Sequence, residues 1–341
     1  MSKVTIIDVA RLAGVSTATV SRAMHTPEVV RPATLERVQK VMRECGYVYN
    51  ATAGDFSRRK STMVGVLVLS TTTKVAASLA AAQAVATEHQ FPLMIGTSNF
   101  DAKLERKYLQ QFLQRGVAGL LVMGHMRENL PLIKEMQERG IPSVFLWELF
   151  PGTKHSYVGF DNVKGSYAMV DYLIRQGHER IGFICGHTAG VERIVKRYQG
   201  YKDALEANGL PLDESLVKSA VSSFARGRQS MRELMGLRNP PRCVCCASDV
   251  LAMGALAAVW ESGRTVPRDY NIVGFDNSEL SAYTSPTLST VDVPGDEMGR
   301  LGMEALLQLV NDDAHPPIQR ELPTSLILRA SSCPADRMHP W

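Results

Sequence analysis

A segment near the N-terminus, STATVSR at residues 16–22, is dense in side chains that can form hydrogen bonds. Four hydroxyls and one guanidinium stand where a helix that only packed against a core would carry Leu or Ile. Short hydroxyls and arginine can bond base edges and phosphate oxygens when a helix enters the major groove of DNA. The residue types therefore indicate contact with double-stranded DNA.

The surrounding residues predict the elements that would present this segment. Thr5 and Asp8 resemble a helix-capping pair, and Gly14 can end a first helix in the left-handed conformation. Ser16 is a suitable N-cap for a second helix, so the two form a helix-turn-helix.

A third helix is predicted over residues 32–45, with Pro32 in its first turn and Gly46 beyond its end. Ala18 and Val20 of the second helix can face inward. The remaining core residues of this all-α headpiece are expected to be Ile6, Val9, Ala10, Ala13, Leu35, Val38, Val41 and Met42.

Positive charge is concentrated in the same part of the chain. The 341 residues carry a formal charge of +4, but the first 60 contain ten Lys and Arg against five Asp and Glu. The remainder is close to neutral, so only the N-terminal part has the charge that favours phosphates.

Other compositional features narrow the class of protein. The sequence has no apolar run long enough to span a membrane and no secretion signal, so we expect no membrane partner and a cytoplasmic location. Three of the six cysteines lie in RCVCCASD, without the spacing of a zinc site. We expect them to be reduced, apolar residues of a buried strand, with no metal and no cofactor.

The segments TIIDVARLAGVSTATVSR and GYVYNATAGDFSRRKSTMVGVLV resemble the lactose-repressor/galactose-repressor family of bacterial transcription regulators. The resemblance implies a DNA-binding domain at 1–48, a hinge at 49–61 and an effector-binding and dimerisation domain at 62–341. It also implies that Thr17 and Ala18 choose the operator. Phosphate and neighbouring base contacts would come from Thr5, Ser16, Thr19, Ser21, Arg22, Thr34, Tyr47 and Asn50.

The hinge departs from the family pattern. Relatives read Tyr-x-Pro-Asn and then Ala-Arg-x-Leu, and their leucine wedges into the minor groove. This chain keeps Ala53, but Tyr49 replaces the proline, Gly54 the arginine and Phe56 the leucine. Phe56 remains an apolar wedge, whereas Gly54 lowers helix propensity by about 1 kcal/mol relative to Ala.

From residue 62 onwards, short apolar runs alternate with helical stretches, a pattern typical of parallel sheets with helices on both faces. The pattern repeats in two halves. We therefore expect a periplasmic-binding-protein-like domain of two doubly wound lobes, roughly 62–160 and 161–290, which residues 291–341 complete. Ligands of such folds bind at the carboxyl ends of the strands.

Polar and aromatic residues follow several predicted strands, which is the chemistry of a sugar or nucleoside site. The family resemblance assigns effector contacts to Arg197, Ser248 and Asp276, and an aromatic stacking role to Trp147 and Phe224. Where relatives carry Asn-Pro-Phe-Phe, this chain has STTTK, and Lys74 there suggests a sugar acid. No motif for catalysis is present, so an enzyme is not expected.

The sequence thus predicts a homodimeric regulator, a repressor, that reads a pseudo-palindromic operator under the control of a small metabolite. The alternative is a stand-alone solute-binding protein. The basic headpiece and the missing secretion signal argue against that alternative.

Replacing Gly54 with Arg should raise operator affinity, because the substitution restores helix propensity and adds a cation near the phosphates. Titration of a labelled operator at two salt concentrations measures the change. Unchanged affinity would contradict this interpretation of the hinge.

Overall fold

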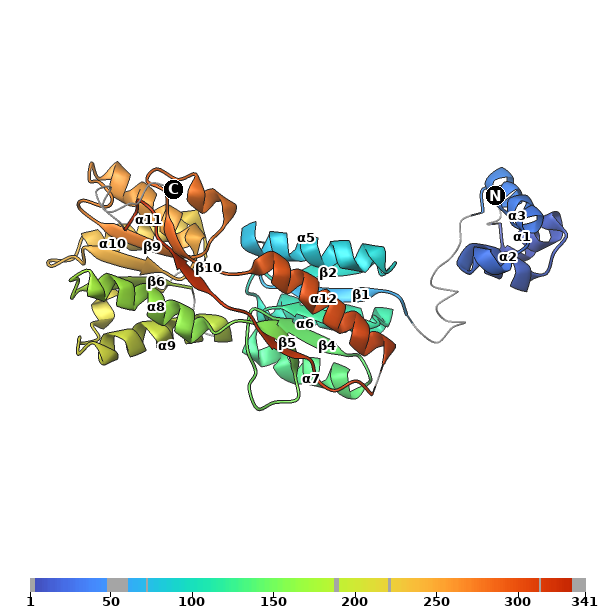
Figure 1. Ribbon diagram of the computed structural model, residues 1–341, viewed down its shortest axis with the longest axis horizontal. Helices are drawn as coiled ribbons and strands as arrows, with labels where there is room; N and C mark the ends of the chain where they lie inside the picture. The colour runs from blue at the N-terminus through green and yellow to red at the C-terminus, as the bar shows by residue number, and fades with distance from the viewer. Residues whose placement is uncertain are drawn as a thin grey trace. The chain divides into compact units, whose positions relative to one another are not determined.

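The computed structural model describes residues 4–47, 61–71, 73–186, 190–219, 222–312 and 314–332, and the chain divides into two units, Met1–Ser61 and Thr62–Trp341. The first unit holds α1 (Ile6–Ala13), α2 (Thr17–His25), the 3-10 turn η1 (Pro27–Val29) and α3 (Pro32–Cys45) (Figure 1). The predicted helix-turn-helix and third helix are confirmed.

Side chains cap the N-termini of α1 and α2, and glycines follow the C-termini of α1 and α3, as predicted. The Thr5 hydroxyl accepts from the Asp8 amide at 3.4 Å, and the Asp8 carboxylate accepts from the Thr5 amide at 3.0 Å. The Ser16 hydroxyl accepts from the Thr19 amide at 3.1 Å. Gly14 and Gly46 adopt φ of 62° and 63°, a conformation that favours glycine.

The headpiece core is small and differs from the prediction at one position. Val20 is buried as expected, but Ala18 is exposed and Ala23 packs inward instead. Residues 20 and 23 are three apart and share one face of α2, whereas residue 18 lies about 200° around the helix from residue 20. The other fully buried apolar residues of this core are Val9, Ala10, Ala13 and Val38.

The first lobe of the large unit is a six-stranded sheet with strand order β11-β5-β4-β3-β1-β2, paired in parallel throughout. The strands are β1 (Val64–Val68), β2 (Leu93–Thr97), β3 (Gly119–Met123), β4 (Ser143–Leu146), β5 (Ser156–Gly159) and β11 (Gln319–Glu321). Its helices are α5 (Thr73–Glu88), α6 (Ala102–Arg115), α7 (Leu130–Glu138) and α12 (Gly295–Asn311), with the turn η2 (Arg127–Asn129).

The second lobe has strand order β12-β10-β9-β8-β6-β7, in which only the β10–β12 pair is antiparallel. The strands are β6 (Ile181–Cys185), β7 (Val217–Ser219), β8 (Cys243–Cys246), β9 (Asn271–Asp276), β10 (Ser289–Asp292) and β12 (Ser325–Ile327). The helices are α8 (Asn162–Arg175), α9 (Glu192–Ala207), α10 (Phe224–Met235) and α11 (Asp249–Glu261), with turns η3 (Glu214–Leu216) and η4 (Glu279–Ala282).

The chain passes between the two lobes three times: after β5, after β10 and between β11 and β12. After β10 it returns to the first lobe, where α12 lies beside α5 (Figure 1). Gly299 of α12 permits this close approach, because a Cβ there would overlap the Ser78 backbone carbonyl. Three adjacent connections hold the lobes together at one end of each sheet.

The cysteine prediction is confirmed for β8, whose Cys243, Cys245 and Cys246 side chains are fully buried. Burial raises the pKa of each thiol, which keeps them protonated and unreactive. Across the described ranges, no three His, Cys, Asp or Glu residues cluster as metal ligands. None of the helices described there is both long and apolar enough to cross a membrane.

Glu105 of α6 is a fully buried carboxyl that ties α6 to the segment after β3. It accepts hydrogen bonds from the Met126 amide at 2.9 Å and the Asn129 side-chain amide at 3.0 Å, both through Oε1. Burial raises the pKa of Glu105 from 4.5 to about 7 against these hydrogen bonds.

Because the folded protein binds this proton more tightly than the unfolded chain, the free energy of unfolding should rise as the pH falls from about 7 to 4.5. Glu105→Gln keeps the hydrogen-bond acceptor but cannot bind the proton. Its free energy of unfolding should therefore rise less than that of wild type as the pH falls, by up to about 1.4 kcal/mol per pH unit. Urea unfolding across this pH range measures the difference. Glu88→Gln, at an exposed site, is the control; parallel curves for wild type and Glu105→Gln would contradict the assignment.

Candidate functional site

The helix α2 carries five of the twelve residues that the family resemblance assigns to DNA contact. Thr17, Ala18 and Arg22 are exposed, while Thr19 and Ser21 are half-buried. Thr17 and Ala18 open the helix, where backbone amides and the helix dipole favour negative charge. The N-terminal end of α2 is thus suited to a phosphate-flanked groove.

The other assigned headpiece residues lie at the ends of helices. Thr5 and Ser16 are exposed N-caps, so their hydroxyls already bond neighbouring residues. Thr34 is half-buried in the first turn of α3, and Tyr47 packs against the headpiece core just after α3. The assigned hinge residues Asn50, Ala53 and Phe56, with Tyr49 and Gly54, lie outside the described residues.

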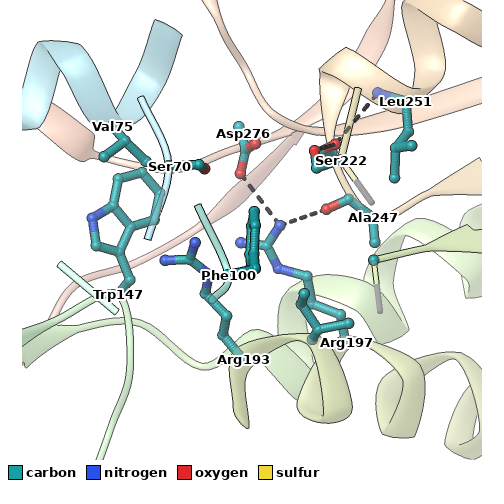
Figure 2. Close-up of a pocket in the computed structure, with 13 residues that line it drawn as sticks. Ser70, Val75, Phe100, Trp147, Arg193, Arg197, Ser222, Ala247, Leu251 and Asp276 are labelled. Atoms are coloured by element: carbon teal, nitrogen blue, oxygen red, sulfur yellow. Dashed lines mark hydrogen bonds and ion pairs between the residues drawn. The ribbon is translucent and has the colours of Figure 1, made fainter. Parts of the chain in front are cut away.

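A cavity of about 50 Å³ lies in the large unit between the two sheets. Four of the five predicted effector residues, Trp147, Arg197, Ser248 and Asp276, meet there. Figure 2 shows Trp147, Arg197 and Asp276 around the cavity. Most lining residues follow the carboxyl ends of strands, as expected for this topology. The other lining residues are Ser70, Val75, Phe100, Gly186, Arg193, Ile194, Ser222, Ala247 and Leu251.

Phe224 is not among the residues that line this cavity. It is the first residue of α10, its side chain is 51% exposed, and its carbonyl oxygen faces Gly254 of α11. The aromatic walls are Trp147 and Phe100 instead. Phe100 was missed by sequence reasoning, although its place shortly after the apolar run LMIGT is a signal for the carboxyl end of a strand.

Arg197 occupies the centre of the site with only 5% of its surface exposed. Its NH1 donates to the Ala247 carbonyl at 2.6 Å and lies 3.3 Å from Asp276 Oδ1. Its guanidinium also stacks 3.8 Å above the Phe275 ring. Burial lowers the pKa of Arg197 to about 10, and the Asp276 charge opposes the shift, so the group stays cationic.

Asn162 connects this cation to the other lobe. Its side-chain oxygen accepts from Arg197 Nε at 2.8 Å, and its side-chain nitrogen donates to the Trp147 carbonyl at 2.8 Å. Trp147 has φ of 73°, and the lining residues Phe100 and Asp276 have φ of 64° and 114°. Such conformations are strained for non-glycine residues and often accompany functional sites.

Arg193 is a second cavity cation that sequence reasoning missed. It precedes Arg197 by four residues and therefore lies on the same face of α9, which was the available signal. Lys74, which suggested a sugar acid, does not line the cavity; its Nζ lies 3.9 Å from Asp292. A cation does face the cavity, but from a different helix.

Two other carboxylates that follow predicted strands have structural partners. Asp161 caps α8 by accepting from the Val163 and Lys164 amides. Asp249 accepts from the Thr290 hydroxyl at 2.6 Å and the Ser278 amide at 2.6 Å. Burial and the nearby Asp276 charge raise the pKa of Asp249 to about 7. Neither residue lines the cavity.

Comparison with known proteins agrees with this architecture. Residues 5–50 match the model for bacterial regulatory proteins of the lacI family, and residues 170–332 match a periplasmic binding protein-like domain. The HTH-type transcriptional repressor CytR of Escherichia coli K12 is 32% identical over 96% of both chains. The regulator CelR of Thermobifida fusca is 33% identical over 95% of this chain and 96% of its own length.

Solved structures give the same picture. The lac repressor dimer bound to operator and the anti-inducer ONPF aligns over 97% of this chain and 99% of its own, with TM-score 0.84 and 25% identity. A CelR–cellobiose complex aligns over 97% of this chain and 100% of its own, with TM-score 0.72 and 31% identity.

Replacing Asp276 with Asn should destabilise the large unit by about 3 kcal/mol, because the buried Arg197 guanidinium would lose the carboxylate with which it pairs. Equilibrium unfolding in urea measures this loss. Glu206→Gln, at an exposed position near the end of α9, should cost less than about 0.5 kcal/mol. Equal losses in the two variants would contradict a charge-compensating role for Asp276.

Proposed function

The chain belongs to the lacI family of bacterial regulatory proteins, and from that premise we propose roles for its two sites. Members of this family are DNA-binding transcription regulators with an effector-binding domain, and this chain is one of them rather than an enzyme. The relatives span the helix-turn-helix as well as the large unit, which disfavours a stand-alone solute-binding protein.

In the proposed DNA complex, α2 lies in the major groove and its N-terminal residues read bases. The observation that carries this proposal is the exposed Thr17, Ala18 and Arg22 surface on the second helix of the headpiece. Thr17 and Ala18 select the half-site. The supporting phosphate and base contacts come from Thr5, Ser16, Thr19, Ser21, Arg22, Thr34, Tyr47 and Asn50, with Ala53 and Phe56 in the minor groove.

The regulator acts as a homodimer in the cytoplasm, where each headpiece reads one half of a pseudo-palindrome. The related lac repressor structure is a dimer on its operator, which supports the same assembly here.

A small polar metabolite, a sugar, sugar acid or nucleoside, binds in the cavity through Trp147, Arg197, Ser248 and Asp276. The cavity has room for on the order of four water molecules, so a larger ligand requires the lobes to separate. Such a change in the angle between lobes alters the spacing of the paired headpieces. Since the two headpieces must bind both half-sites at once, a change in their spacing weakens the DNA contacts of both headpieces.

Selection of bound fragments from genomic DNA by the full-length protein, at 150 mM salt, tests this proposal. The expected result is a recurring palindrome. On that operator, Thr17→Ala should cost about 1–3 kcal/mol and relax the preference at one base pair of each half-site.

Gln39→Ala is the matched control, because Gln39 is an exposed polar residue of α3 and should leave both affinity and preference unchanged. Binding that depends on salt but not on sequence would contradict the proposal.

A further inference from the structure

Two arginines and one carboxylate line the cavity. Arg193 and Arg197 are 8% and 5% exposed, and Asp276 is 9% exposed. Among the described lining residues these are the only ionisable side chains, which leaves an excess of one positive charge. Buried cations are stable in proteins only when they are paired with opposite charge or fully hydrogen-bonded.

The two arginines differ in how their donors are used. Arg197 bonds Asn162, Ala247 and Asp276, so its position is fixed by the protein. Arg193 NH1 is buried and has no hydrogen-bond partner among the described residues. Figure 2 shows the Arg193 guanidinium directed toward Trp147 and into the cavity, with no bond drawn to it.

A second unused donor comes from the opposite lobe. Trp147 Nε1 is also buried without a partner in the described part of the chain, and the Arg193 guanidinium carbon lies 5.8 Å from the Trp147 ring. A buried donor left unpaired costs about 1–3 kcal/mol. Each lobe thus contributes one buried donor without a described partner, and the Arg193 guanidinium faces the Trp147 ring.

Of the described carboxylates, Glu148 attracts Arg193 most strongly, although it does not line the cavity. It is 1% exposed, and no ion pair within 4.0 Å joins these two described residues. Both of its oxygens lack hydrogen-bond partners among the described residues. Glu148 therefore offsets the Arg193 charge at a distance and leaves the NH1 donor without a partner among the described residues.

From this arrangement we propose that the effector is an oxyanion, a small hydroxylated molecule whose carboxylate or phosphate group is bound by Arg193. This assignment rests on the proposed effector role of the cavity and specifies the class of ligand. Ser70, Ser222 and Ser248 line the remaining space and bind hydroxyls of the same molecule. Because Ser70 follows β1 of the first lobe and Arg193 belongs to α9 of the second, the same molecule contacts both lobes.

Calorimetric titration of the full-length protein with matched ligands tests the charge requirement. One series is glycerol, glycerate and glycerol 3-phosphate; the other is glucose, glucuronate and glucose 6-phosphate, all at constant ionic strength. At least one anion should bind 10-fold or more tightly than its neutral counterpart. Preference for the acids indicates a carboxylate site, and preference for the esters indicates a phosphate site.

Arg193→Gln should weaken the preferred anion about 10- to 100-fold, the loss expected for hydrogen bonds to a charged group. Arg226→Gln removes the same charge from an exposed position on α10 and should leave the affinity unchanged. If Arg193→Gln does not fold, the wild-type comparison of acid, ester and neutral ligand decides alone.

The inference is overturned if no anion exceeds its neutral counterpart 10-fold, or if folded Arg193→Gln binds the anion as wild type does. A separate operator titration with the bound anion tests the regulatory proposal. An anion that binds through Arg193 but leaves operator affinity unchanged would contradict regulation while supporting the ligand class.

Discussion

The large unit is organised around one buried cation. Arg197 places a full charge between two sheets, where an unpaired charge would be severely destabilising. Its surroundings meet that demand through Asn162, the Ala247 carbonyl, Asp276 and the face of Phe275. These groups come from α8, the end of β8 and β9, so the position of one guanidinium fixes how several elements of the second lobe meet.

The same constraint reaches the first lobe through Asn162, which bonds both Arg197 and the Trp147 carbonyl. Trp147 is held in a left-handed conformation at the end of β4, which a bulky residue adopts only when its surroundings impose it. The cost of that conformation is consistent with a site whose geometry matters more than local stability. A ligand between the lobes thus acts on residues that are already mechanically connected.

The headpiece is stabilised by a small apolar core and by the caps of its helices, not by a buried charge among its described residues. Six described apolar residues are buried in this core, with partly buried ones packed around them. Side-chain caps begin α1 and α2, and left-handed glycines follow α1 and α3. Since the apolar residues face inward, the hydroxyls and Arg22 on α2 are left for other contacts. Ala18 illustrates the point, because sequence periodicity suggested the core while the family resemblance suggested the operator, and the residue is exposed.

The sequence by itself determined the features that local chemistry controls. These include the helix-turn-helix with its caps, the two lobes of alternating strand and helix, and the buried cysteine strand. The family resemblance added four cavity residues at strand ends or on α9. Hydrophobic periodicity and helix capping depend on residues close together in the chain, so a single sequence is enough to predict them.

Only the tertiary structure decided which side chains meet. It directed Phe224 to the surface, used Phe100 as the second aromatic wall, paired Lys74 with Asp292 and placed Arg193 in the cavity. These outcomes depend on how helices pack across two sheets, and residues far apart in sequence set that packing. The spacing of residues along the chain therefore does not predict these contacts.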